Sequence, residues 1–482
     1  MRATAFLDKI DQRIGDGLEA VLRSQHRRRL SRLGWLDALE QHGDTWWSTR
    51  APVRSGNSLE VLIDGESALP AMEEAIRGAQ RSVTIANWHA SPQFRLTRGP
   101  AAPSLRDLLG EAAERVPVRL LLWAGPPVPL FQPTRKTVNK ARDAFMAGTK
   151  VQCALDARER TMHCHHEKIV VVDDTVAFVG GIDFTDLQGD RSDASAHPPR
   201  APMGWHDAAV RLTGPAVADV ARHVSQRWTE ITGESIPPAP APAPTGSVDV
   251  QVLRTVPERT YEFAPRGEFT ILDAYLEALR SAQDFIYLEN QFLWSPEVVD
   301  VLAYKLQNPP SDDFRVLLLL PSRPSNGADT TRGQLGRLLE ADDSANRLLA
   351  TTISGYRDVD SVPVYVHAKI GVVDDRWLTV GSANLNEHSL FNDTELNVVT
   401  CDGALARDTR LRLWSEHTQR PVDQLTGDPT RVIEEVWRAT AEEQSRRIEA
   451  GLPRTHRLSL LANVSRRSDR LQGPVRGLVV DG

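Results

Sequence analysis

Two short stretches of the sequence carry the same pattern of histidine, lysine and aspartate. In each, a lysine follows the histidine by two residues and an aspartate follows the lysine by five. A Gly-Gly or Gly-Ser pair comes after six further residues. The two sets are His166, Lys168 and Asp173, and His367, Lys369 and Asp374. One set alone would be weak evidence, because a single histidine is often a satisfied core residue. Two sets at identical spacing indicate a functional pair.

These residue types suit phosphoryl transfer. Imidazole is both a nucleophile and a proton carrier near neutral pH. One histidine would attack phosphorus and the other would protonate the leaving oxygen, while two lysines neutralise the phosphate oxygens. The pattern therefore predicts a phosphohistidine intermediate with no metal and no cofactor. Zinc bound by residues 163–166, His-Cys-His-His, is the alternative. Crowding in one strand beside Lys168 disfavours it.

The elements that must position these residues are buried strands. Apolar runs at 169–172 and 370–373 follow the two motifs. In a strand, residues two apart point to the same side, so each histidine and its lysine should point together. Asp173 and Asp374, although part of the catalytic motifs, should brace the turns at the strand ends rather than touch substrate.

The motifs belong to a longer internal duplication with an offset near 200 residues. The same order of apolar strands and helical segments occurs twice, and each copy closes with a helix that ends at a tryptophan. The matched pairs are 68–80 with 271–283, 82–85 with 285–288, 118–123 with 316–320, and Trp228 with Trp414. Alternating strands and helices predict an α/β fold. We expect two duplicated α-β-α sandwich lobes related by pseudo-twofold symmetry.

The midpoint of the chain marks the boundary between the copies. A run of alternating proline and alanine cannot form a helix or a ladder and indicates an extended linker. The expected organisation is a helical N-terminal flank at 1–54, a first lobe at 55–235, the linker at 236–247, a second lobe at 248–435, and an Arg-rich C-terminal flank at 436–482.

The duplicated pattern H-x-K-x4-D-x6-G-[GS]-x-[ND] resembles the phospholipase D superfamily. Three further segments agree: IYLENQF at 286–292, VQVLR at 250–254 and GWHD at 204–207. The resemblance covers about 55–420, and is greatest to the phospholipase-type members. It implies a single site where the two lobes meet.

The resemblance also implies individual roles. His166 would be the nucleophile, and His367 the general acid that later activates water or an alcohol. Lys168 and Lys369 would hold the phosphate.

Four further residues follow from the same resemblance. Asn384 would donate a hydrogen bond to phosphate. Asp207 would orient His367 and Glu395 would orient His166, crossing between lobes; capping or solvent-facing carboxylates are the alternative. Asp183 stands where many bacterial members have asparagine. An ionised carboxylate repels phosphate, so Asp183 should be neutralised by a neighbour or turned aside.

The composition of the chain limits its possible partners and its cellular compartment. Lys and Arg number 57 against 64 Asp and Glu, and the net charge of −7 disfavours a polyanion as the main partner. Three cysteines make no disulfide framework. The N-terminal stretch does not read as a secretory signal, and no apolar run approaches the roughly 18 residues of a membrane span. We expect a cytoplasmic monomer, peripheral to a membrane if its Arg-rich flanks bind anionic lipid rather than form ion pairs.

The expected activity is cleavage or transfer of phosphatidyl groups of phospholipids, with water or an alcohol as acceptor. A cardiolipin synthase-like phosphatidyltransferase shares all of this chemistry. A nuclease is disfavoured by the net charge. A non-catalytic scaffold is disfavoured by two intact motifs.

Overall fold

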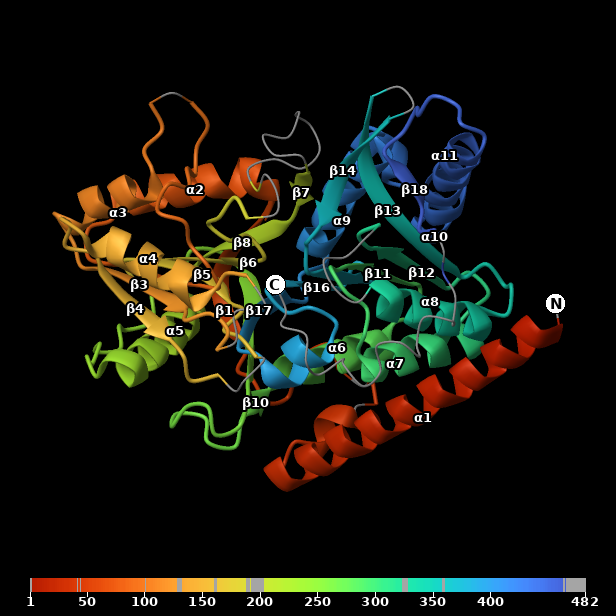
Figure 1. Cartoon of the computed structure of the whole chain (residues 1–482), viewed down its shortest axis with the longest axis horizontal. Coiled ribbons are helices and arrows are strands. Elements are labelled where there is room, and N and C mark those ends of the chain that lie inside the picture. Colours follow the sequence, from red (N-terminus) through yellow and green to blue (C-terminus); the bar gives the residue numbers. More distant parts are fainter. Residues whose placement is uncertain are drawn as a thin grey trace.

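Two lobes of similar architecture lie side by side in the computed structural model (Figure 1). The structure describes residues 2–462 and 464, except 41, 44, 100, 128–131, 160–162, 188–190, 192–202, 323–327 and 358–359. Each lobe is a mixed sheet with helices on both faces. The α/β fold expected from the duplication is confirmed.

The sheet of the first lobe has the strand order β1-β8-β6-β5-β2-β3-β4. The run β2-β3-β4 is parallel and the remaining pairs are antiparallel. The bounds are β1 Arg54–Ile63, β2 Val83–Asn87, β3 Val118–Trp123, β4 Gln152–Asp156, β5 Lys168–Val172, β6 Val176–Gly180 and β8 Ala208–Thr213.

The sheet of the second lobe repeats this order as β9-β17-β16-β15-β11-β12-β13. Among the described strands, three additions distinguish it: β10 Glu268–Phe269 pairs with β9, and both β14 Asp360–Val366 and β18 Leu458–Leu460 pair with β13. Part of the expected C-terminal flank thus completes the second sheet. The other bounds are β9 Val248–Val256, β11 Phe285–Glu289, β12 Arg315–Leu319, β13 Leu348–Arg357, β15 Ile370–Val373, β16 Trp377–Gly381 and β17 Glu395–Thr400.

Helices cover both faces of each sheet, and strand residues divide between them. On β5, Ile169 and Val171 pack in a core that includes α5, whereas Val170 and Val172 pack against α2, α3 and α4. The continuous apolar runs follow from this burial on both faces. The helices are α2 Asp64–Gly78, α3 Leu105–Ala113, α4 Arg135–Met146, α5 Val217–Thr232, α6 Thr270–Ser281, α7 Pro296–Gln307, α8 Ala328–Asp342, α9 Gly403–Thr418, α10 Pro429–Val432 and α11 Ala439–Glu449, with shorter turns η1 Leu36–Leu39, η2 His388–Asn392, η3 Val422–Leu425 and η4 Ile433–Arg438.

The two lobes share one apolar core. Val179 and Val210 of the first lobe pack in the same cluster as Val380 and Val398 of the second. Strand β1 also pairs with β9 across the lobes. We call the surface where the lobes meet the seam. Between α5 and β9, residues 233–247 form no helix or strand.

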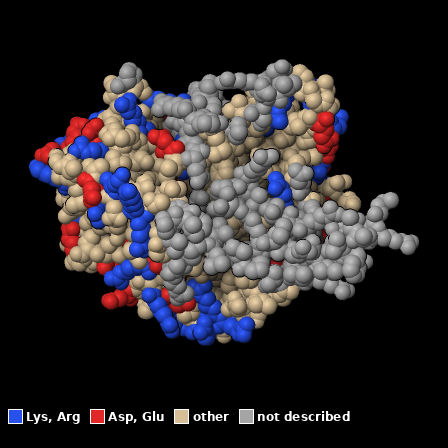
Figure 2. Space-filling view, viewed as in Figure 1, with Lys and Arg blue, Asp and Glu red and all other residues tan. Residues whose placement is uncertain are grey.

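The N-terminal helix α1, Arg2–Leu33, docks on the second lobe although it precedes the first (Figure 1). His26 Nδ1 lies 2.6 Å from Glu297 on α7, and Arg29 contacts Glu258 at 2.6 Å. Several arginines of this flank are therefore in ion pairs. Arg28 and Arg32 are exposed. Lys and Arg side chains gather at the lower edge of Figure 2, where the end of α1 lies in Figure 1.

The distal arginines of the C-terminal flank, 466, 467 and 470, lie outside the described residues. Among the helices that the structure describes, none combines the length and apolar character needed to cross a bilayer.

Candidate active site

The polypeptide backbone carries each motif histidine across the seam. His165 pairs with Thr394, and the His166 N–H donates to the Thr394 carbonyl at 3.0 Å. In the other direction, β14 Asp360–Val366 runs parallel to β7 Gly204–His206. There the His367 N–H donates to the His206 carbonyl at 2.8 Å. Both histidines lie just before strands β5 and β15, not within them as the sequence pattern suggested.

These crossings bring each imidazole to a carboxylate of the opposite lobe. His166 Nδ1 lies 2.9 Å from Glu395 Oε1, and His367 Nδ1 lies 2.6 Å from Asp207 Oδ2. All four side chains are buried. Because a carboxylate accepts, each Nδ1 carries the proton, which leaves Nε2 as the reactive nitrogen. The two contacts implied by the resemblance are present.

The surroundings of the two carboxylates differ. Glu395 also accepts hydrogen bonds from Ser382 and from Ser389, the latter at 2.5 Å. Asp207 accepts from the Ala208 N–H at 2.8 Å and lies against Gly181. A Cβ at Gly181 would fall 2.1 Å from Asp207 Oδ1. Glycine is thus required there for Asp207 to reach His367.

The lysines are tied to the same segments. Lys168 Nζ donates to the His166 carbonyl at 2.7 Å, and Lys369 Nζ donates to the His367 carbonyl. Lys168 lies 3.5 Å from Asp183, so the carboxylate expected to need a neutralising neighbour has one.

In the second lobe the corresponding lysine faces an amide instead of a carboxylate. Lys369 Nζ and Asn384 Nδ2 each lie 3.3 Å from Gln291 Oε1. Gln291 belongs to the ENQF segment at 289–292, and its spacing in the sequence did not predict this contact.

Burial and positive charge shape the protonation of the site. Burial, together with Lys369, Arg191 and Lys168, holds the pKa of His367 well below its usual range. Burial raises the pKa of Asp207 and of Glu395. These surroundings therefore favour a neutral His367 at neutral pH.

The motif aspartates lie at the other ends of their strands, away from the histidines. Asp173 accepts hydrogen bonds from the backbone N–H groups of Gln80, Arg81 and Ser82 at 2.6–3.1 Å. Asp374 does the same for residues 283–285 at 2.6–2.9 Å. The bracing role expected for them is the one observed: they fasten the loops that lead into β2 and β11 and are not part of the catalytic centre.

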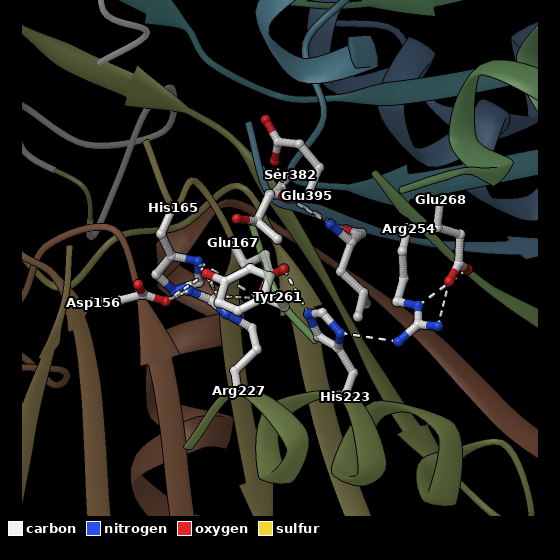
Figure 3. Close-up of polar contacts among 12 residues, drawn as sticks. Asp156, His165, Glu167, His223, Arg227, Arg254, Tyr261, Glu268, Ser382 and Glu395 are labelled. Carbon is white, nitrogen blue, oxygen red and sulfur yellow. Dashed lines mark hydrogen bonds and ion pairs between the residues drawn. The ribbon is translucent and has the colours of Figure 1, made fainter. Parts of the chain in front are cut away.

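A buried ionic network anchors the first motif and was not foreseen from the sequence (Figure 3). Glu167 lies 2.9 Å from Arg227 and 2.6 Å from His223, both on α5. His165 contacts Arg227 as well, so the zinc set at 163–166 is not assembled. In the second motif Ala368 replaces Glu167. The only hint of this network in the sequence was the charged residue Glu167 between His166 and Lys168.

A second network joins the lobes next to Asp207. His206 Nδ1 lies 2.8 Å from Asp64 and its Nε2 lies 2.7 Å from Glu289. Burial opposes charge on His206, but Asp64 and Glu289 outweigh it and raise its pKa well above the usual value. The residue next to Asp207 is thus an imidazolium clamped between two carboxylates.

Known protein families match both halves of the chain. Residues 75–199 match the family model described as Phospholipase D, and residues 275–414 match Cardiolipin synthase, PLD-like domain. Phospholipase D A of Dictyostelium discoideum is 25% identical over 79% of this chain and 37% of its own length. Phospholipase D2 of Bos taurus is 28% identical over 73% of this chain and 50% of its own length.

Two further relatives are bacterial. Cardiolipin synthase A of Pseudomonas fluorescens is 27% identical over 76% of this chain and 70% of its own length. The crystal structure of phosphatidylserine synthase from Haemophilus influenzae superposes with a TM-score of 0.54 at 14% identity, covering 83% of this chain and 98% of that one. The chain spans about a third to a half of the eukaryotic relatives named above. Because family models of this group match both halves of the chain, and phospholipases D and a cardiolipin synthase are among its relatives, the chain belongs to the phospholipase D superfamily.

Proposed function

We propose that this protein is a phosphodiesterase that cleaves or transfers the phosphatidyl group of phospholipids through a phosphohistidine. The observation that carries the proposal is the reciprocal pairing of His166 with Glu395 and of His367 with Asp207. Because each Nδ1 is paired with a carboxylate, the Nε2 atoms of both histidines can act on a phosphate group held by the two lysines. Similarity to phospholipases and phosphatidyltransferases supports the substrate class.

In the first step the Nε2 lone pair of His166 attacks phosphorus. The bond from phosphorus to the headgroup oxygen breaks, and that oxygen takes the proton from Nε2 of His367. Glu395 stabilises the charge that develops on the His166 ring. Lys168, Lys369 and Asn384 stabilise the negative charge on the phosphoryl oxygens.

The acid acquires its proton together with the substrate. Before substrate binds, burial and the neighbouring cations lower the pKa of His367. A phosphodiester anion between the lysines offsets their charge and raises that pKa. His367 is then protonated when the leaving group needs it, and neutral again for the second step.

In the second step His367 removes a proton from the acceptor, whose oxygen attacks phosphorus and releases His166. Water gives phosphatidic acid, whereas an alcohol gives a new phosphodiester. A cardiolipin synthase-like transferase is the second candidate, favoured by the family model matched at residues 275–414 and by the Pseudomonas relative.

The test is to incubate the purified full chain with mixed phospholipid vesicles, with and without glycerol, and to identify products by mass spectrometry. Phosphatidic acid alone indicates a hydrolase. Phosphatidylglycerol formed with glycerol, or cardiolipin formed from phosphatidylglycerol, indicates a transferase. His166→Ala and His367→Ala are the inactive controls. Cleavage of a nucleic acid with no change in any phospholipid would contradict the substrate class.

A further inference from the structure

Clusters of imidazole and carboxylate groups lie at the seam outside the two catalytic pairs. One is the cluster of His206, Glu289 and His417. Its donor and acceptor atoms are already joined by hydrogen bonds of 2.7 and 2.9 Å. Glu289 also accepts from Tyr287. Atoms that share protons at this spacing leave no room for an ion between them, so this cluster is a hydrogen-bonded one.

A different geometry holds for His163, His388 and Asp393. One ligand atom from each lies within 4.8 Å of the other two. His163 Nδ1 lies 3.5 Å from Asp393 Oδ1, beyond the usual range of a hydrogen bond. Metal bonds of about 2.0–2.2 Å in a tetrahedron separate neighbouring donors by about 3.3–3.6 Å. The separation of His163 Nδ1 and Asp393 Oδ1 therefore suits two ligands of one ion.

We propose that His163, His388 and Asp393 bind a zinc ion that links the two lobes beside the active site. Two imidazoles and one carboxylate are a donor set that zinc accepts. Three protein ligands leave the fourth position for water. The His163 side chain is 14% exposed while Asp393 is fully buried, so the ion would enter from the His163 side.

Groups of the first lobe fix the position of the Asp393 carboxylate. The Cys164 N–H donates to Asp393 Oδ1 at 2.9 Å, and the Cys164 thiol lies 3.5 Å from Oδ2. A carboxylate anchored in this way beside two imidazoles is preorganised for a cation.

The position of the site gives it a consequence for the neighbouring catalytic pair. His163 precedes His166 by three residues, whereas His388 is the first residue of η2 and Asp393 directly follows η2 in the second lobe. Ser389, next to His388, donates to Glu395 at 2.5 Å. A bound ion would therefore stiffen both segments that form the His166–Glu395 contact, without itself touching the phosphate.

The experiment uses the untagged full chain, dialysed against a chelator and titrated with zinc in competition with a chromophoric chelator. Elemental analysis should give one zinc per chain. His163→Ala and His388→Ala should each weaken binding by at least about 100-fold, the upper end of the loss caused by removing an outer partner of a metal ligand. His42→Ala is the matched control, because His42 is exposed and lies outside the cluster, and it should bind as wild type does.

Cobalt substitution supplies a readout that does not depend on activity or on any variant folding. The wild-type chain loaded with cobalt should show the intense visible absorption of four-coordinate Co²⁺. Absence of that absorption, less than stoichiometric zinc, or zinc affinity unchanged in both His163→Ala and His388→Ala would each overturn the proposal. None of these outcomes bears on the phospholipid activity, so the two proposals fail separately.

Discussion

At the scale of single residues, the two halves of the site are alike in plan and different in detail. Each histidine has a carboxylate from the other lobe, but Glu395 is shared with two serines and Asp207 is not. The pKa of His367 is lowered by burial and by Lys369, Arg191 and Lys168. These differences are a physical basis for assigning different roles to two histidines that the repeat alone makes equivalent.

The two histidines should fail in different ways. His166→Ala should abolish turnover of a nitrophenyl phosphodiester, by at least about 1,000-fold, because the nucleophile is lost. His367→Ala should still form the phosphohistidine, since nitrophenol leaves without protonation, but should release it about 100- to 10,000-fold more slowly. Stopped-flow absorbance should show a burst followed by a stall. A phosphorylated peptide containing His367 would reverse the assignment.

Substrate binding should take up a proton. The pKa of His367 is low before substrate binds and rises when the phosphodiester anion arrives. At a pH between these two pKa values, binding therefore adds about one proton per site. Calorimetric titration of His166→Asn with a phosphodiester, in buffers of different ionisation enthalpy, measures that number. The double variant His166→Asn/His367→Gln is the control and should take up none. Equal uptake in both would show that another group is titrating.

Asp183 should limit how strongly Lys168 holds the phosphate. The carboxylate lies 3.5 Å from Lys168 and both side chains are buried, so part of the lysine charge is already neutralised. Asp183→Asn should lower KM for a soluble phosphodiester roughly three- to tenfold. Asn384→Asp makes the mirror-image change near Lys369 and should raise KM. A rise in KM for Asp183→Asn would instead show that its carboxylate contacts a donor group of the substrate.

At the scale of elements, the site depends on two backbone crossings and on the residues that permit them. The segment before β5 pairs with the residue that precedes β17, and the segment before β15 pairs with β7, which leads into β8. Gly181 lies where one of these segments passes. A substitution that alters the packing of these backbone segments should therefore change the orientation of the catalytic histidines, even when the substituted residue does not contact the substrate.

Gly181→Ala should reduce kcat with little loss of folded protein. Its Cβ would lie 2.1 Å from Asp207 Oδ1, so Asp207 must shift and the His367 ring loses its orientation. A displacement of about 1 Å at such a site costs about 100-fold in rate. Gly78→Ala is the matched control, because a Cβ there meets no atom within 4 Å. Steady-state kinetics and circular dichroism on both variants test this, and wild-type kcat for Gly181→Ala would contradict it.

The repeated strands were predictable from the sequence. A strand that is buried on both faces of its sheet needs apolar residues at successive positions, as at 169–172 and 370–373. The contacts of Glu395 with His166 and of Asp207 with His367, each from the opposite lobe, could be predicted only from the family resemblance. The links through Arg227, Asp64 and Gln291 were not predictable, because they depend on contacts between residues far apart in the chain. The second sheet's added strand β18 was missed since the duplication has no counterpart for it in the first lobe.

At the scale of the whole molecule, the lobes are not separable bodies. They share an apolar core, β1 pairs with β9, and α1 packs on the second lobe. Cutting the chain at the linker would expose the apolar residues of the seam and leave α1 on the wrong fragment.

Fragments 1–236 and 246–482, expressed separately, should be poorly soluble and inactive toward phosphodiesters. Each holds one histidine and the carboxylate that serves the other. Co-expression should recover part of the activity, because the two fragments together contain both pairs. Size-exclusion chromatography and nitrophenyl phosphodiester assays check both outcomes. Cleavage by either fragment as a monomer would contradict a shared site.

The exchange of carboxylates across the seam also has a bearing on ancestry. A chain with a single lobe would hold a histidine and a carboxylate that cannot meet, and would complete both pairs only in a twofold dimer. Fusing two such copies through the linker makes the assembly independent of protein concentration. It also frees each copy to mutate alone. Asp183 opposite Asn384 and Gly181 opposite Ser382 are differences that a homodimer, whose two halves share one gene, cannot acquire.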